Sequence, residues 1–200
     1  MALRKIVTEG DPVLRKRARE VEKITSKERM IFDDMVETMR ASNGCGLAAP
    51  QVGLLKRMIV VEVPDPETEL EGVGEETLSD QGFHEEGLAT DNDHLEDELL
   101  SDKKVPERPL ILYRLANLEV VNMSGSQIGE EGCLSVPGVI GNVERPECIH
   151  LKALDYNGDS VEIHGKGFLA VALCHEIDHL NGVLFTDKAT DIEELENQED

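Results

Sequence analysis

The sequence predicts an α+β fold in which mixed, mainly antiparallel sheets pack around a central helix with the pattern His-Glu-x-x-His. Three observations predict it: short β-branched runs, an Asn-Gly turn between two alternating segments, and two segments with apolar residues at helical spacing. The chain has 200 residues, which is enough for one domain with its own core. We therefore expect a single domain over residues 1–200.

Two helices are predicted. The first runs from about residue 26 to residue 40, because Thr25 or Ser26 can cap its N-terminus and Asn43 with Gly44 can end it. Its apolar residues recur at four-residue spacing and share one face, which comprises Ile31, Met35 and Met39. The second helix covers residues 168–180, and its pattern stops at an Asn-Gly pair.

Strands are predicted in the remaining apolar segments. Residues 57–63 are β-branched and indicate a buried strand, and residues 110–113 and 118–121 indicate one or two more. Residues 148–154 alternate between apolar and polar side chains. After a turn with Asn-Gly at its centre, residues 160–164 return as the second arm of a hairpin.

The acidic residues are concentrated in two segments. The formal net charge is -22, and residues 64–109 hold 16 acidic residues against three basic ones. Residues 187–200 hold seven acidic residues and one lysine, so the rest of the chain is close to neutral. A segment so poor in apolar side chains cannot offset the entropy of its ordering. We predict a mobile, solvated acidic insertion at about 64–109, with one marginal helix near its end, and an acidic C-terminal tail at about 187–200.

This charge balance excludes several classes of partner. Nucleic-acid binding needs clustered basic residues, so no direct nucleic-acid contact is predicted, and anionic membranes are unfavourable for the same reason.

The sequence has no run of about 18 apolar residues, and the start Met1-Ala2-Leu3-Arg4-Lys5 is not followed by an apolar segment. We expect a cytoplasmic protein whose four cysteines are thiols or metal ligands.

The second predicted helix carries His175-Glu176-Ile177-Asp178-His179. Four residues is about one helical turn, so the two imidazoles project from the same face and can bind one metal ion. Glu176 lies beside them, where it can act as general base toward a metal-bound water. Such a site needs a third protein ligand. The pattern predicts a metal-dependent hydrolase.

Cys133 is the favoured third ligand. It stands in the segment Glu131-Gly132-Cys133-Leu134-Ser135, and a thiolate with two imidazoles suits iron(II), zinc, nickel or cobalt. Cys45 and Cys148 are more typical of ordinary small side chains. Cys174 projects about 100° away from its neighbour His175 around the helix, which favours a core role.

Three segments together resemble the peptide deformylase family. The family carries a Gly-x-Gly-x-Ala-Ala-Pro-Gln segment, then Glu-Gly-Cys-x-Ser, then His-Glu-x-x-His, and here they stand in that order at 44–51, 131–135 and 175–179. The segments Asp11-Pro12-Val13-Leu14-Arg15 and Gly182-Val183-Leu184-Phe185 are also similar to the family's start and end. The resemblance covers the chain apart from the acidic insertion and tail, and it implies an enzyme of the bacterial type.

The resemblance implies a role for each matching residue. Cys133, His175 and His179 would hold one Fe²⁺ per chain, which Zn²⁺, Ni²⁺ or Co²⁺ can replace. Glu176 would be the general base and acid, and the side-chain amide of Gln51 with the backbone N–H of Leu134 would stabilise the negative charge on the formyl oxygen. The substrate would be the N-formyl-Met terminus of nascent peptides near the ribosome exit, and formate would be released.

The resemblance also implies a substrate pocket. Its lining would comprise Gly44, Gly46, Glu131, Phe168, Val171 and Ala172. For the last three, simple core packing is at least as good an interpretation. Many family members have an arginine where this chain has Ile140, and Arg145 is the candidate to replace it at the substrate backbone.

Two other classes of function stay open from the residues alone. A metal-dependent endopeptidase shares the His-Glu-x-x-His helix but gives no reason for Cys133 as a ligand or for the glutamine segment. The other class is a non-catalytic binding protein that acts through its acidic insertion. The loss of Glu176 or of a candidate metal ligand would indicate such a protein, but these residues are all present. The insertion could also limit binding to anionic surfaces such as ribosomal RNA.

Overall fold

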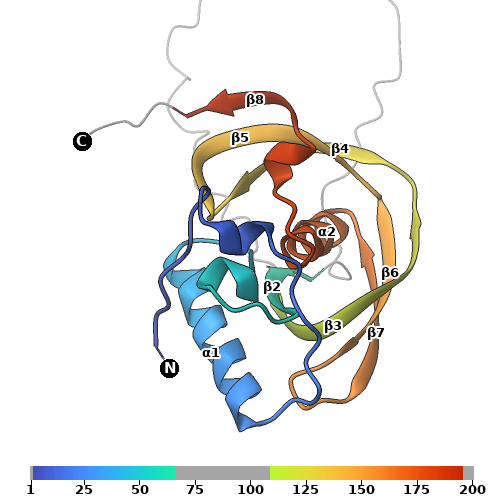
Figure 1. The fold of residues 1–200 in the computed structure, drawn as a ribbon. Helices are drawn as coiled ribbons and strands as arrows, with labels where there is room; N and C mark the ends of the chain where they lie inside the picture. Colours follow the sequence, from blue (N-terminus) through green and yellow to red (C-terminus); the bar gives the residue numbers. More distant parts are fainter. Residues whose placement is uncertain (1, 66–108, 196–200) are drawn as a thin grey trace, which may run out of the picture.

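The computed structural model describes residues 2–65 and 109–195. Nearly all of the predicted acidic insertion, with its marginal helix, lies outside these residues, as does the end of the predicted tail. Within them the chain forms two antiparallel sheets, two α-helices and three short 3-10 helices, so the α+β class is confirmed (Figure 1). The 3-10 helices are η1 (Pro12–Arg15), η2 (Ala49–Val52) and η3 (Phe185–Asp187).

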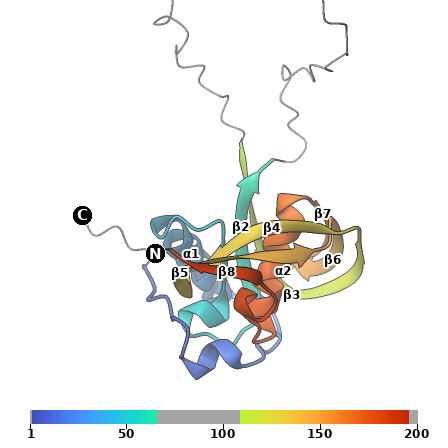
Figure 2. The same cartoon turned by 90° about the horizontal axis from the view of Figure 1, so that it is seen from above.

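The larger sheet has the strand order β1-β2-β3-β6-β7, and every neighbouring pair is antiparallel. Its strands are β1 (Gly46–Ala48), β2 (Met58–Pro64), β3 (Leu110–Ser124), β6 (Cys148–Leu154) and β7 (Ser160–Lys166). The smaller antiparallel sheet has the order β4-β5-β8, formed by β4 (Gln127–Cys133), β5 (Val136–Arg145) and β8 (Thr190–Glu194). Figure 2 shows β8 lying along the edge of this smaller sheet.

The first helix, α1 (Ser26–Ala41), matches its prediction closely. Thr25 is the N-cap, and its side chain and that of Glu28 form a reciprocal capping box. The predicted apolar face is fully buried and packs with Leu47 and Met58. Burial of this face against β1 and β2 fixes the segment that follows the helix, which contains Gly44 and Gly46.

The second helix, α2 (Phe168–Leu180), has the predicted bounds. It packs against β1, β2 and β7 of the larger sheet and against β5 of the smaller one, and Figure 1 shows it end-on between them. Its apolar side is part of the main core, through Leu169, Ala170, Leu173, Ile177 and Leu180. The His-Glu-x-x-His pattern is therefore held by an element that contacts both sheets.

The structure joins two of the predicted strands into one. Residues 110–113 and 118–121 both belong to β3, with a register shift between Ala116 and Glu119. Asn117 has φ 53° there, and its side chain accepts from Val21 N–H at 2.8 Å and donates to Val21 carbonyl oxygen at 2.8 Å. A local bulge with its own hydrogen bonds replaces the break that the sequence indicates.

The smaller sheet was not predicted. β4 and β5 contain Gly129, Gly132, Gly138 and Gly141, which weaken any strand pattern, and β8 is acidic and fully exposed. β8 begins within the predicted acidic tail and pairs with β5 through Val139 and Ile140.

Neither α1 nor α2, the α-helices of the described residues, is both long and apolar enough to cross a membrane.

Replacing Glu28 by Gln tests the start of α1. Glu28 accepts hydrogen bonds from Lys56 at 2.5 Å and from Thr25, and these lower the pKa of its carboxyl from 4.5 to about 2. Because the folded-state pKa lies below the unfolded one, the carboxylate stabilises the fold above pH 4.5, and this stabilisation is lost as the pH falls toward 2. Glu28→Gln should lower the free energy of unfolding at pH 7 by about 1–2 kcal/mol.

Urea unfolding between pH 7 and pH 3 measures this difference, with Glu37→Gln on the same helix as the control. The loss caused by Glu28→Gln should shrink as the pH is lowered. A loss that is the same at every pH would contradict the role given to the Glu28 charge.

Candidate active site

Three side chains that can bind a metal converge at the junction of α2 with the smaller sheet. Cys133 Sγ lies 3.2 Å from His179 Nε2, and this nitrogen lies 3.2 Å from Nε2 of His175. The ligand atoms of all three residues lie within 4.8 Å of one another. Since the histidines are one turn apart on α2 and Cys133 ends β4, the helix and the sheet together create the cluster.

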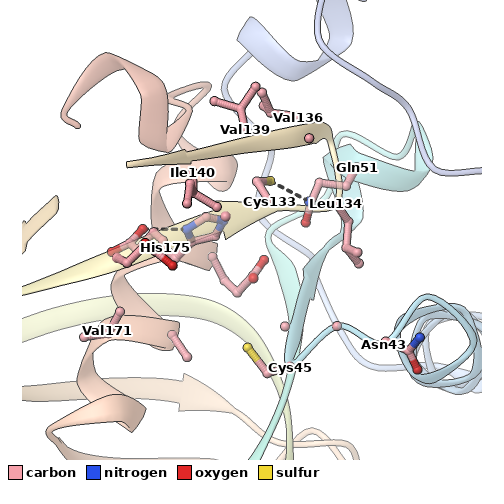
Figure 3. A pocket seen from close by; sticks show the side chains of 18 of the residues that line it. Asn43, Cys45, Gln51, Cys133, Leu134, Val136, Val139, Ile140, Val171 and His175 are labelled. Carbon is pink, nitrogen blue, oxygen red and sulfur yellow. Dashed lines mark hydrogen bonds and ion pairs between the residues drawn. The ribbon is translucent and has the colours of Figure 1, made fainter. Parts of the chain in front are cut away.

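The Cys133 sulfur is surrounded by hydrogen-bond donors. Ser135 N–H lies 3.4 Å from it, and Gln51 Nε2 lies 3.5 Å away, an interaction drawn in Figure 3. Gln51 is itself fixed, because its Oε1 accepts from Ala48 N–H at 2.7 Å and its Nε2 also donates to Ser135 Oγ at 3.2 Å. Cysteine binds metals through its sulfur as a thiolate, and these two donors lie against that sulfur.

A buried ionic network supports the histidines. Arg145 donates two parallel hydrogen bonds to Glu131, at 2.7 and 2.9 Å, and a third to Asp178 at 2.6 Å. Lys188 also binds Asp178, at 2.8 Å. The Arg145 side chain is only 3% exposed. The suggestion that Arg145 replaces the missing arginine at the substrate is therefore wrong, because its donors are committed to two buried carboxylates.

Glu131 links this network to the metal-ligand cluster. Burial alone would raise the pKa of its carboxyl, but the hydrogen bonds from Arg145 and His175 outweigh burial and lower it to about 2. Its Oε2 lies 2.8 Å from His175 Nδ1. An ionised carboxylate can only accept, so Nδ1 carries the proton and Nε2 faces Cys133 and His179.

The environment of the two imidazoles favours one positive charge between them. Burial would lower the pKa of His175, but Cys133 and Glu131 outweigh it and raise the pKa to about 10. Burial and the neighbouring His175 lower the pKa of His179 to about 3, so this ring is neutral. A metal cation at Nε2 of His175 can take the place of a proton there. The donor set therefore fits a divalent transition metal.

Glu176 is buried beside this cluster. Burial and the charge of Glu131 raise the pKa of its carboxyl to about 7 against the opposing effect of His175. Its Oε2 has no hydrogen-bond partner among the residues described by the structure. A buried carboxyl with a pKa near neutrality and a vacant acceptor is suited to take and return a proton.

A pocket of about 390 Å³ opens on this cluster (Figure 3). It is lined by nearly all of the candidate site residues: Gly44, Gly46, Gln51, Glu131, Cys133, Leu134, Phe168, Val171, Ala172, His175 and Glu176. His179 does not line it, because this side chain is buried behind Cys133. The structure therefore brings together residues from three separate segments of the chain, 44–51, 131–134 and 168–176.

Steric constraints explain why glycine occupies positions 44 and 46. A Cβ on Gly46 would lie 2.3 Å from Glu176 Oε1, and one on Gly44 would lie 2.7 Å from Leu134 Cδ1. Neither glycine has a positive φ, so the requirement is space rather than backbone conformation. Gly46 lets the chain pass directly beside the buried carboxyl.

Several lining residues were not predicted. They include Asn43, Cys45, Val136, Val139 and Leu195. Ile140 also lines the pocket, and only the family resemblance pointed to this position. Cys45 is exposed to the pocket rather than packed in a core. Cys174 is buried as expected, and burial raises the pKa of its thiol to about 11. No local pattern marks the β4–β5 residues, because their place at the pocket depends on the strand pairing.

Comparisons with known proteins show the family to which the chain belongs. The sequence profile of the polypeptide deformylase family matches residues 3–195. A peptide deformylase of Alkaliphilus metalliredigens is 44% identical over 188 residues, which are 94% of this chain and 97% of the relative. A peptide deformylase of Acetivibrio thermocellus is 41% identical, covering 94% of this chain and 84% of the relative.

Solved structures show the same relation. The peptide deformylase of Ehrlichia chaffeensis in complex with actinonin matches with a TM-score of 0.70 and 34% identity, over 96% of this chain and 91% of that one. The Met-Ala-Ser-bound enzyme of Acinetobacter baumannii matches with a TM-score of 0.69 and 30% identity, over 94% and 98%. The chain thus belongs to the polypeptide deformylase family, metal-dependent hydrolases of protein biosynthesis that remove the formyl group from N-terminal methionine.

Proposed function

We propose that this chain hydrolyses the formyl group of N-formyl-Met peptides with Cys133, His175 and His179 as metal ligands and Glu176 as general base and acid. The observation that carries the proposal is the convergence of these three ligand atoms beside a buried carboxyl, at the wall of one pocket. An endopeptidase would explain the helix but not the thiolate ligand. In this account α2 is the central, metal-binding helix of the fold.

The residues fit one divalent metal per chain. The sulfur and the two Nε2 atoms converge, and Glu131 fixes the ring of His175 from the far side. The family resemblance favours Fe²⁺, and Zn²⁺, Ni²⁺ or Co²⁺ can replace it, because a mixed thiolate and imidazole set suits all four metals. When bound, the metal supplies Lewis acidity, which makes a coordinated water acidic near neutral pH and polarises a carbonyl.

Glu176 moves the proton. Its unpaired Oε2 accepts the proton of the water that attacks the formyl carbon. The same carboxyl then donates this proton to the methionine nitrogen as the bond to the formyl carbon breaks, so that formate and a free N-terminal amine are released. A pKa of about 7 suits both steps, since the group is a competent base and a competent acid near neutrality. Burial keeps competing solvent away from the carboxyl.

Gln51 and Leu134 stabilise the negative charge that develops on the formyl oxygen. The Gln51 amide lies beside Cys133 and is held there by Ala48 and Ser135. Leu134 follows Cys133 directly at the β4–β5 turn and lines the same pocket, which supports its backbone N–H as the second donor. Donors fixed in advance are effective because they need not reorganise as the charge forms.

The rest of the pocket binds the peptide. Gly44, Gly46 and Glu131 would line the path of the substrate backbone, and Phe168, Val171 and Ala172 would contact the methionine side chain. Ile140 offers an apolar contact where many relatives carry an arginine, so substrate affinity depends less on charge here. The enzyme would act in the cytoplasm on nascent peptides near the ribosome exit, as one domain with its acidic insertion and tail.

Formate release from formyl-Met-Ala-Ser tests the function directly. The protein is prepared without oxygen, and metal content is measured on the same samples, because iron(II) with a thiolate ligand is prone to oxidation. Glu176→Gln should retain one metal per chain and lose about 10²–10⁴-fold in turnover, which is the usual contribution of a general base. No release from a protein that holds one Fe²⁺ or Ni²⁺ per chain would contradict the proposal.

Gly46→Ala tests whether the position of the Glu176 carboxyl matters. The new methyl group would lie 2.3 Å from Glu176 Oε1, so this carboxyl must move. Turnover should fall by at least about tenfold, a part of the general-base contribution, with metal content unchanged. Gly129→Ala in β4 is the matched control, because nothing lies within 4 Å of its added Cβ. Equal turnover in both variants would contradict this positioning.

A further inference from the structure

A second group of metal-binding side chains lies on the β6–β7 hairpin. Along β6 the residues alternate, so that Ile149 and Leu151 are buried while His150 and Lys152 face outward. The register pairs His150 directly with His164. Residues two apart share a face of a strand, which brings Glu162 to the same outer surface, diagonal to His150.

The three side chains approach one another closely. His150 Nε2 lies 2.9 Å from Glu162 Oε2, and the rings of His150 and His164 are stacked with 4.1 Å between their centroids. One ligand atom from each of His150, Glu162 and His164 lies within 4.8 Å of the other two. Two stacked imidazoles and a carboxylate therefore lie close enough for one ion to be reached by all three after small side-chain movements.

A hollow beside the cluster gives a ligand access. It measures about 270 Å³ and is lined by both histidines and by Cys148, with Asn122 and Ser124 from the neighbouring strand β3. The His150 side chain is only 25% exposed, so it is held on the sheet, whereas Glu162 is open to solvent. The hollow has room for the water molecules that complete a coordination sphere with three protein ligands.

We propose that His150, Glu162 and His164 form a second, peripheral binding site for a divalent transition-metal ion of the Zn²⁺ type. Two imidazoles and one carboxylate are a donor set that Zn²⁺ accepts, and the absence of a thiolate among these three distinguishes it from the cluster at Cys133. The bound ion would connect β6 to β7 and so stabilise the hairpin that precedes α2.

The local charges affect the strength of this site. Glu162 carries the negative charge, and its pKa is lowered by the hydrogen bond with His150 and by Lys152. Lys152 Nζ lies 3.6 Å from Glu162 Oε1 and competes with a cation for this carboxylate. Lys166, farther along β7, is paired with Glu147 instead. Lys152→Ala should therefore strengthen Zn²⁺ binding at this site.

Zn²⁺ titration of the holoenzyme tests the proposal. The full chain is first loaded to one Zn²⁺ per chain, and isothermal titration calorimetry then measures further binding. We expect one additional Zn²⁺ per chain, with shifts of the His150 and His164 ring protons in NMR spectra. His150→Ala with His164→Ala should weaken this second event by at least about tenfold, since even the outer partners of metal ligands contribute about 10–100-fold.

The same double variant should retain the first Zn²⁺ and an unchanged rate of formate release. The matched control replaces the other two histidines outside the Cys133 cluster, His84→Ala with His94→Ala, which lie outside the described residues. This control should keep the second Zn²⁺. A holoenzyme that binds no further Zn²⁺, or one whose second Zn²⁺ is lost only in the His84 and His94 variant, would overturn the proposal.

Discussion

The buried ion pairs of Arg145 are the constraint on which the site depends. This guanidinium holds Glu131 of β4 and Asp178 of α2 at once, so it joins the smaller sheet to the second helix. Removing one member of such a network leaves an unpaired buried charge, which costs about 3–5 kcal/mol. Because Glu131 also binds His175 Nδ1, the same contacts determine where the Nε2 of this ring lies.

Local sequence patterns were enough to predict the elements that carry the histidines and the apolar face of α1. The cap at Thr25, the bounds 168–180 and the β6–β7 hairpin each follow from a few neighbouring residues. The smaller sheet could not be predicted in this way, because glycines interrupt β4 and β5 and their pairing is set by contacts with distant residues. The same reason explains why Arg145 was assigned to the substrate rather than to Glu131.

The chemistry of the pocket depends on how tightly these elements pack. Gly46 and the Glu176 carboxyl are adjacent because β1 passes directly over α2, and no side chain larger than hydrogen fits between them. This dense packing removes solvent from Glu176 and raises its pKa to about 7. The sequence contains both Gly46 and Glu176, but only the fold shows that the Glu176 carboxyl can lie in this position because residue 46 has no side chain.

X-ray absorption spectroscopy tests the central claim most directly, because it reports the atoms bound to the metal. The sample is the His150→Ala and His164→Ala variant carrying one Zn²⁺ per chain, so that only the cluster at Cys133 contributes. We expect one sulfur at about 2.3 Å and nitrogen atoms at about 2.0–2.1 Å from Zn²⁺. A spectrum without a sulfur ligand would contradict the assignment of Cys133, and with it the proposed active site.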